Sequence, residues 1–143
     1  MLIVSFTGTR LGMTHQQKIG IRELMMELAP AEAHHGDCKG ADATFHRFCK
    51  LFSCYIVGHP GVDRHGFALT RAYCDVDESL PPLPYLERDK VIVEVSKILI
   101  ATPRMMIEEV RSGTWATVRL ARKRNRTIHI VYPDGSRETE ESK

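Results

Sequence analysis

The sequence predicts a single-domain α/β protein built on a doubly wound sheet of about five parallel strands. Short apolar runs alternate along the chain with segments in which apolar residues recur at helical spacing. Loops that carry glycine follow several of the apolar runs. The chain has 143 residues, 43% of them hydrophobic and 27% charged, which suits one globular domain. We expect the domain to span residues 1–135 and the polar tail, 136–143, to be disordered.

The first half of the chain predicts strands over 2–6, 31–35 and 54–58. Thr14 followed by Gln17 fits a capping box, which predicts a helix that begins there and ends at Pro30. A second helix is predicted from Phe45, Phe48, Cys49 and Phe52, which share one helical face. Successive strand–loop–helix units favour a parallel sheet with right-handed crossovers.

The second half begins with an irregular, proline-rich stretch over 62–84, long enough to form a ligand wall or lid. We expect a helix over 85–97, a strand over 98–102, a helix over 118–126 and a strand over 127–132. Pro133-Asp134-Gly135 predicts a closing turn.

Composition narrows the partners that we expect. The net charge of +2 is too small to indicate nucleic-acid binding, and the basic run Arg119–Arg126 is best interpreted as a solvated helix face. The four cysteines form no metal-binding pattern and indicate free thiols in a reducing cytoplasm. His34, His35 and His59 lack a third ligand at useful spacing, so neither a metal nor another cofactor is predicted. No signal peptide or membrane span is indicated.

Two loops predict the ligand site. In a doubly wound sheet, ligands bind beyond the carboxyl ends of the strands, where strand order reverses, and here the first and fourth strands would be neighbours. The loop Gly8-Thr9-Arg10 would then face the segment 111–117. Backbone N–H groups, a helix N-terminus and arginine suit a phosphorylated ligand, and Asp37 or Asp42 could accept hydrogen bonds from ribose. The predicted ligand-binding residues are Gly8, Thr9, Arg10, Gly36, Asp37, Asp42, Arg111, Ser112, Gly113, Thr114, Trp115 and Thr117.

Several of these residues also have a purely structural interpretation. Ser112-Gly113-Thr114 would serve equally well as a plain helix cap, and Asp42 could cap the helix that follows it. Trp115 could stack on a base, but in the first turn of a helix it is more often a packing residue. The sequence alone leaves these alternatives open.

Arg88, the apolar helix after it, the segment 96–103 and Gly113-Thr114 together resemble the Lonely Guy family of nucleotide phosphoribohydrolases. Gly8-Thr9-Arg10 and Gly36-Asp37 resemble still more closely the small YpsA-like branch of the wider SMF/DprA–Lonely Guy (SLOG) superfamily. The resemblance implies a Rossmann-like fold over 1–135, a nucleotide or nucleotide-derived small molecule at the switch point and, by analogy, a homodimer.

The chain departs from the Lonely Guy pattern at the catalytic positions. Thr117 stands where that family has the glutamate that helps to cleave the N-glycosidic bond, and Asp89 follows Arg88 where the family has lysine. Two functions therefore remain. One is a binding module for a nucleotide-derived ligand. The other is an N-glycosidase in which Arg88 steadies the base or the phosphate and a carboxylate from Asp89, Asp37 or Glu109 replaces the glutamate.

Overall fold

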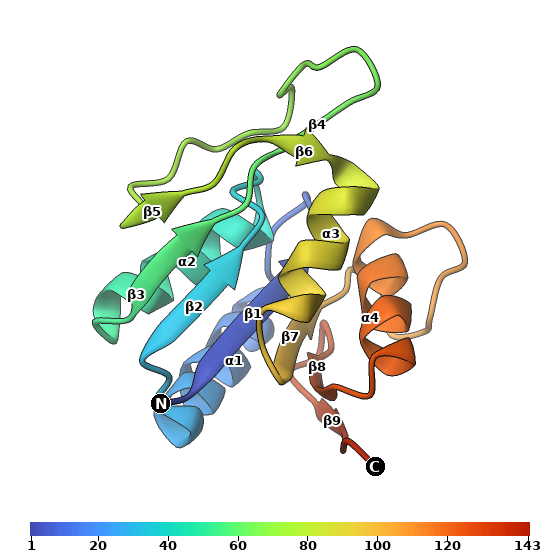
Figure 1. Ribbon diagram of the computed structural model, residues 1–143. Helices are drawn as coiled ribbons and strands as arrows, with labels where there is room; N and C mark the ends of the chain where they lie inside the picture. The colour runs from blue at the N-terminus through green and yellow to red at the C-terminus, as the bar shows by residue number, and fades with distance from the viewer.

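The computed structural model describes residues 1–143 and has helices on both faces of a central sheet (Figure 1). The seven strands of this sheet lie in the order β5-β3-β2-β1-β7-β8-β9. Their bounds are β1 Ile3–Gly8, β2 Glu32–His35, β3 Tyr55–Gly58, β5 Glu78–Ser79, β7 Ile98–Thr102, β8 Thr127–Val131 and β9 Arg137–Glu140. The short strands β4 Gly61–Val62 and β6 Leu83–Pro84 form a separate pair. The helices are α1 His15–Leu28, α2 Ala41–Leu51, α3 Tyr85–Glu94 and α4 Gly113–Lys123.

The doubly wound arrangement is confirmed. The five strands β3, β2, β1, β7 and β8 are parallel, and β1 lies at the centre, between β2 and β7. The pairing of β1 with β7 runs from Val4 opposite Ile98 to Gly8 opposite Thr102, so both strands end at the same level. Strand order reverses between them, as the sequence predicts. The loops that follow β1 and β7 therefore meet at one edge of the sheet.

Each face of the sheet has its own hydrophobic core. Helices α1 and α2 cover one face, where the Phe6 and Phe45 rings stack with their centroids 4.3 Å apart. Helices α3 and α4 cover the other face, where Trp115 and Val118 pack against Leu99 of β7. Both cores hold the loops at the carboxyl end of the sheet in fixed positions.

The predicted capping box at the start of α1 is confirmed. The Thr14 hydroxyl accepts a hydrogen bond from the Gln17 backbone N–H (3.0 Å), and the Gln17 side chain accepts one from the Thr14 backbone N–H (2.9 Å). A cap of this kind stabilises a helix by roughly 1 kcal/mol. The Gln17 amide also donates to the carbonyls of Pro103 and Val131, which ties α1 to the ends of β7 and β8.

Two sequence-based expectations are wrong. The tail is not disordered: Arg137–Glu140 forms β9, antiparallel to β8 at the edge of the sheet. Ion pairs from Arg137 to Glu27 and from Glu140 to Arg122 fix this polar strand, and the apolar periodicity that marks buried strands is absent from it. Helix α4 begins at Gly113 rather than at 118. No helix in the fold combines the length and the apolar character that crossing a membrane requires.

Candidate functional site

A cavity of about 450 Å³ opens at the carboxyl ends of β1, β2 and β7. All the predicted ligand-binding residues line it except Asp37 and Trp115, and Arg88 and Asp89 line it as well. The remaining lining residues are Phe6, Thr7, Cys38, Tyr85, Ile92 and Arg104. Residues from the three loops after β1, β2 and β7, and from the helices α2, α3 and α4, thus converge on one site at the switch point.

Gly8 lies where three elements meet. A methyl group on its Cα would lie 2.5 Å from the Ala41 Cβ and 2.5 Å from the Thr102 Oγ1. Gly40 makes a second close approach: it has φ +91°, and a Cβ there would lie 2.2 Å from the Arg10 carbonyl oxygen. These glycines therefore allow the loop after β1 to pack directly on the start of α2.

Gly113 differs, because no atom lies within 4 Å of where its Cβ would be. The preceding residue, Ser112, caps α4 by accepting a hydrogen bond from the Trp115 backbone N–H (3.3 Å). The first hydrogen bond within the helix runs from Ala116 to Ser112. The N–H groups of Gly113 and Thr114 are therefore free of intrahelical partners, as expected at a helix N-terminus. The capping interpretation is confirmed, and it is compatible with an anion beside Gly113.

Four arginines line the cavity, and they differ in their partners. Arg104 forms an ion pair with Glu109 (2.7 Å), and Arg88 forms one with Asp89 (2.7 Å). Arg10 and Arg111 lie exposed at the rim without an acidic side chain within 4 Å. The Arg10 guanidinium lies 5.6 Å from the centroid of the Tyr85 ring. The cavity thus has two cations that no carboxylate neutralises.

Arg88 is largely a structural residue. It is only 8% exposed, and its Nη1 donates to the carbonyls of Gly36 (2.9 Å) and His59 (3.1 Å). Gly36 follows β2 and His59 follows β3, so this guanidinium joins the ends of two neighbouring strands. A Cβ on Gly36 would lie 2.5 Å from the Arg88 Nη1, which explains why glycine stands there.

Two carboxyl groups line the cavity. Asp42 is 5% exposed, and its Oδ2 accepts a hydrogen bond from the Cys38 backbone N–H (3.1 Å). Burial raises the pKa of Asp42 to about 6, although the nearby Arg88 opposes the shift. Burial also raises the pKa of Asp89, against the opposing effects of Arg88 and of the Thr117 hydroxyl. The Asp89 carboxyl therefore lies beside the threonine that replaces the glutamate of the Lonely Guy pattern.

Asp37 and Trp115 do not reach the cavity, which corrects two site predictions. The Asp37 carboxylate points to the other side of its loop, where it accepts hydrogen bonds from Arg71 (3.1 Å) and from the Cys74 backbone N–H (2.8 Å). Trp115 is 1% exposed and packs in the core on the α3/α4 face, near Tyr132. Its indole ring cannot stack on a ligand, and the packing interpretation is the correct one.

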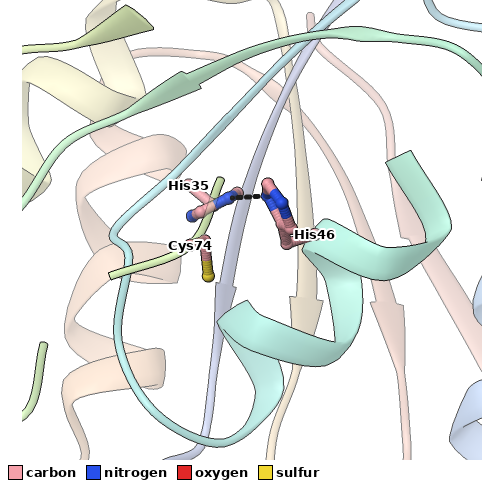
Figure 2. A group of neighbouring side chains, drawn as sticks. All are labelled: His35, His46 and Cys74. Carbon is pink, nitrogen blue, oxygen red and sulfur yellow. Dashed lines mark hydrogen bonds between the residues drawn. The ribbon is translucent and has the colours of Figure 1, made fainter. Parts of the chain in front are cut away.

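A histidine–cysteine group that sequence spacing missed lies outside the cavity. His35 lies in β2, His46 in α2 and Cys74 in the segment between β4 and β5, and their potential ligand atoms lie within 4.8 Å of one another (Figure 2). Spacing along the chain could not reveal the group, because Cys74 lies far from both histidines in sequence.

Hydrogen bonding accounts for the two histidines of this group without a metal. The Asp37 backbone N–H donates to the His35 Nδ1 (2.9 Å), which assigns the proton of the neutral ring to Nε2. That Nε2 lies 3.1 Å from the His46 Nδ1 and donates to it. Burial lowers the pKa of His35 to about 3, which keeps the ring neutral. A metal-binding histidine normally donates a hydrogen bond from its second nitrogen, whereas His35 accepts one.

The basic run after the cavity is neutralised by neighbouring acids. Arg119 and Arg122 both pair with Glu108, and Arg122 also pairs with Glu140. Arg124 and Arg126 pair with Glu94. This pairing supports the interpretation of the run as a solvated helix face rather than as a nucleic-acid contact.

No protein-family model matches the chain, and no curated protein sequence matches it either. Several solved structures, in contrast, are similar to this chain. A molybdenum cofactor binding protein from the phototrophic bacterium Rippkaea orientalis has a TM-score of 0.66 and 16% identity, over 92% of this chain and 76% of its own. The molybdenum cofactor carrier protein MCP from Chlamydomonas reinhardtii has a TM-score of 0.61 and 18% identity, over 90% of this chain and 75% of its own.

DNA processing protein A (DprA) from Streptococcus pneumoniae is a third similar structure, with a TM-score of 0.64 and 16% identity. The similarity covers 91% of this chain but only 50% of that protein. At these identities the likeness shows the fold. It confirms the Rossmann-like fold that the resemblance implies. Two of these similar structures are of proteins that bind or carry a small-molecule cofactor.

Proposed function

We propose that the cavity binds a phosphorylated small molecule of the nucleotide or nucleotide-derived class. One observation carries the proposal: Arg10 and Arg111 have no acidic partner and line the same cavity as the N-terminus of α4. Guanidinium groups bind phosphate oxygens through paired, charge-assisted hydrogen bonds. The helix N-terminus adds backbone N–H donors and a favourable dipole, worth roughly 0.3–1 kcal/mol.

Thermal unfolding with a panel of ligands tests this proposal. The panel contains inorganic phosphate, the common nucleoside monophosphates and a phosphorylated pterin. A ligand present at about 100 times its Kd stabilises the folded state by about 2.7 kcal/mol, which is several degrees of Tm for a domain of this size. Arg10→Ala and Arg111→Ala should each weaken binding about tenfold or more.

Arg22→Ala is the matched control, since Arg22 lies exposed on α1 and does not line the cavity. Equal loss of affinity in all three variants would reflect net charge alone and would contradict a site at the switch point. The pterin belongs in the panel because two of the similar structures are of proteins that bind or carry the molybdenum cofactor.

A second candidate function is N-glycosidase activity on a nucleoside monophosphate. The observation that favours it is the position of Asp89, whose carboxyl lies beside Thr117 and against Arg88 (2.7 Å). A carboxylate there would stabilise the oxocarbenium-like transition state of base release. Release of free base from a nucleoside monophosphate, lost in Asp89→Asn, is the expected result of this function. Ligand binding without any base release would leave the protein as a binding module.

We also propose that the protein is a homodimer and acts in the cytoplasm. The segment between β7 and α4 extends outward (Figure 1) and exposes the apolar side chains of Met105, Met106, Ile107 and Val110. Exposed apolar groups of this kind favour contact with another protein surface. The four cysteines are free, as is usual in a reducing compartment. Sedimentation equilibrium that gives the mass of one chain at micromolar concentration would contradict the dimer.

A further inference from the structure

The cavity has two chemically different ends. At one end lie the N-terminus of α4 and Arg111, which suit an anion. At the other end, beyond the tip of β2, lie Gly36, Cys38 and Asp42. Strand β1 separates β2 from β7, so the two ends are two strand spacings apart, about 10 Å. A nucleoside monophosphate with its phosphate at α4 is long enough to bring its base to the β2 end.

The β2 end presents an acceptor. Asp42 lies in the first turn of α2, and its Oδ2 is held by the Cys38 backbone N–H (3.1 Å). This leaves Oδ1 with the greater capacity to accept hydrogen bonds from a ligand. The side chain is 5% exposed and lies close to Gly36, where an added Cβ would be 2.9 Å from Oδ2. Asp42 is thus a fixed, buried acceptor at the edge of the cavity.

A buried carboxylate requires donors from the ligand. Adenine presents a ring nitrogen acceptor beside its amino group, which a carboxylate repels. The 2-amino-4-oxopyrimidine ring of guanine and of pterins presents a ring N–H and an amino group side by side, and these match the two oxygens of a carboxylate. Ribose hydroxyls are donors too, but a ribose next to a phosphate at α4 would lie over β1 rather than beyond β2.

We propose that Asp42 recognises the ring N–H and 2-amino group of a 2-amino-4-oxopyrimidine, so that the ligand is a guanine nucleotide or a phosphorylated pterin. This inference rests on the proposed function, because it assumes that the phosphate lies at α4. Arg88, which joins the ends of β2 and β3, keeps the loop that carries Gly36 in position.

Calorimetric titration of the full-length chain tests the inference. The probes are GMP, IMP, AMP, xanthosine monophosphate and dihydroneopterin monophosphate. GMP should bind at least tenfold more tightly than IMP, which lacks the 2-amino group, and AMP should bind more weakly still. If the natural ligand is a pterin, dihydroneopterin monophosphate should bind more tightly than GMP, and its affinity should show the same dependence on Asp42.

Asp42→Asn should reverse the preference. The amide oxygen can keep the hydrogen bond from Cys38, and the amide N–H₂ then meets the 2-amino group of guanine donor to donor. Xanthosine monophosphate has a carbonyl at that position, so it should bind the variant at least tenfold more tightly than GMP does. Asp75→Asn is the matched control, since the Asp75 side chain is 93% exposed and lies outside the cavity. It should leave every affinity unchanged.

The failures of the two proposals are distinguishable. Similar affinities for GMP, IMP and AMP in the unmodified protein would overturn the role of Asp42 and leave the phosphate site standing. An equal loss of affinity for all nucleotides in Asp42→Asn would indicate that Asp42 contacts the ribose, and it would also overturn the role of Asp42 in recognising the base. Failure of every phosphorylated probe to bind would refute the proposed function, and the inference with it.

Discussion

The loops after β1 and β7 carry similar residues but use their glycines differently. In the first loop a methyl group on Gly8 would lie 2.5 Å from Ala41 and 2.5 Å from Thr102, so the glycine is needed for packing. In the second loop Gly113 has open space beside it. The comparison teaches that the same residue type, at the same edge of one sheet, can serve the fold in one loop and be free for a ligand in the other. The predictions below test that distinction.

The largest expected effect is that of Gly8→Ala. The added methyl group has no space between α2 and β7, and overpacking a tight core costs typically 1–3 kcal/mol. We expect a loss near the upper end, about 3 kcal/mol in the free energy of unfolding, measured by urea denaturation. A loss below about 0.5 kcal/mol would show that the first loop is as open as the second.

Asp42→Asn should have nearly as large an effect, but of the opposite sign. Because the pKa of Asp42 is raised from 3.8 to about 6, the folded state holds a proton that the unfolded state releases, and stability falls as the pH rises through that window. The penalty above pH 6 is on the order of 3 kcal/mol. The variant should therefore be more stable than the unmodified protein at pH 8, and the gain should disappear below about pH 4. A gain that does not depend on pH would contradict this account.

Ser112→Ala should cost about 1 kcal/mol, because the Trp115 backbone N–H loses its cap. Thermal unfolding measures this loss. The affinity for a phosphorylated ligand should change less than it does on removal of Arg111, since the Ser112 hydroxyl already serves the helix. An affinity loss as large as that of Arg111→Ala would show that the hydroxyl contacts the ligand instead.

Zinc should have the smallest effect. Both ring nitrogens of His35, the atoms that would bind Zn²⁺, are already hydrogen-bonded. Nδ1 accepts a hydrogen bond from the Asp37 backbone N–H, and Nε2 donates one to the His46 Nδ1. Adding an excess of Zn²⁺ should leave Tm unchanged within error, both in the unmodified protein and in the Cys74→Ser variant. A rise in Tm that Cys74→Ser abolishes would show that the group in Figure 2 binds metal.

The buried part of the fold could be predicted from the sequence, because burial imposes apolar patterns. The five parallel strands and the helix opened by Thr14 carry such signals. Strand β9 could not be predicted, since both its faces are polar and ion pairs such as that of Arg137 with Glu27 fix it. The start of α4 was predicted too late, because Gly113 and Thr114 are poor helix formers in isolation.

The candidate site could be predicted as a set of loops but not as a set of side-chain directions. Asp37 stands in the loop after β2 and Asp42 stands in the first turn of α2, yet only Asp42 faces the cavity, because Asp37 is drawn to Arg71 on the other side. Trp115 follows the cavity residues directly, but the turn of the helix directs its ring into the core. Local sequence identifies which loops meet at the switch point, whereas tertiary contacts decide which side chains face the cavity.

Gly113→Ala tests the central claim, a phosphate bound against the start of α4, most directly. The backbone of Gly113 does not need a positive φ, and no neighbour obstructs an added methyl group, so the ligand-free variant should melt at or slightly above the normal temperature. A phosphate that lies against this backbone would meet the methyl group. The affinity for the best phosphorylated ligand should then fall more than about tenfold, or about 1.4 kcal/mol. Unchanged affinity in the folded variant would contradict a phosphate at α4.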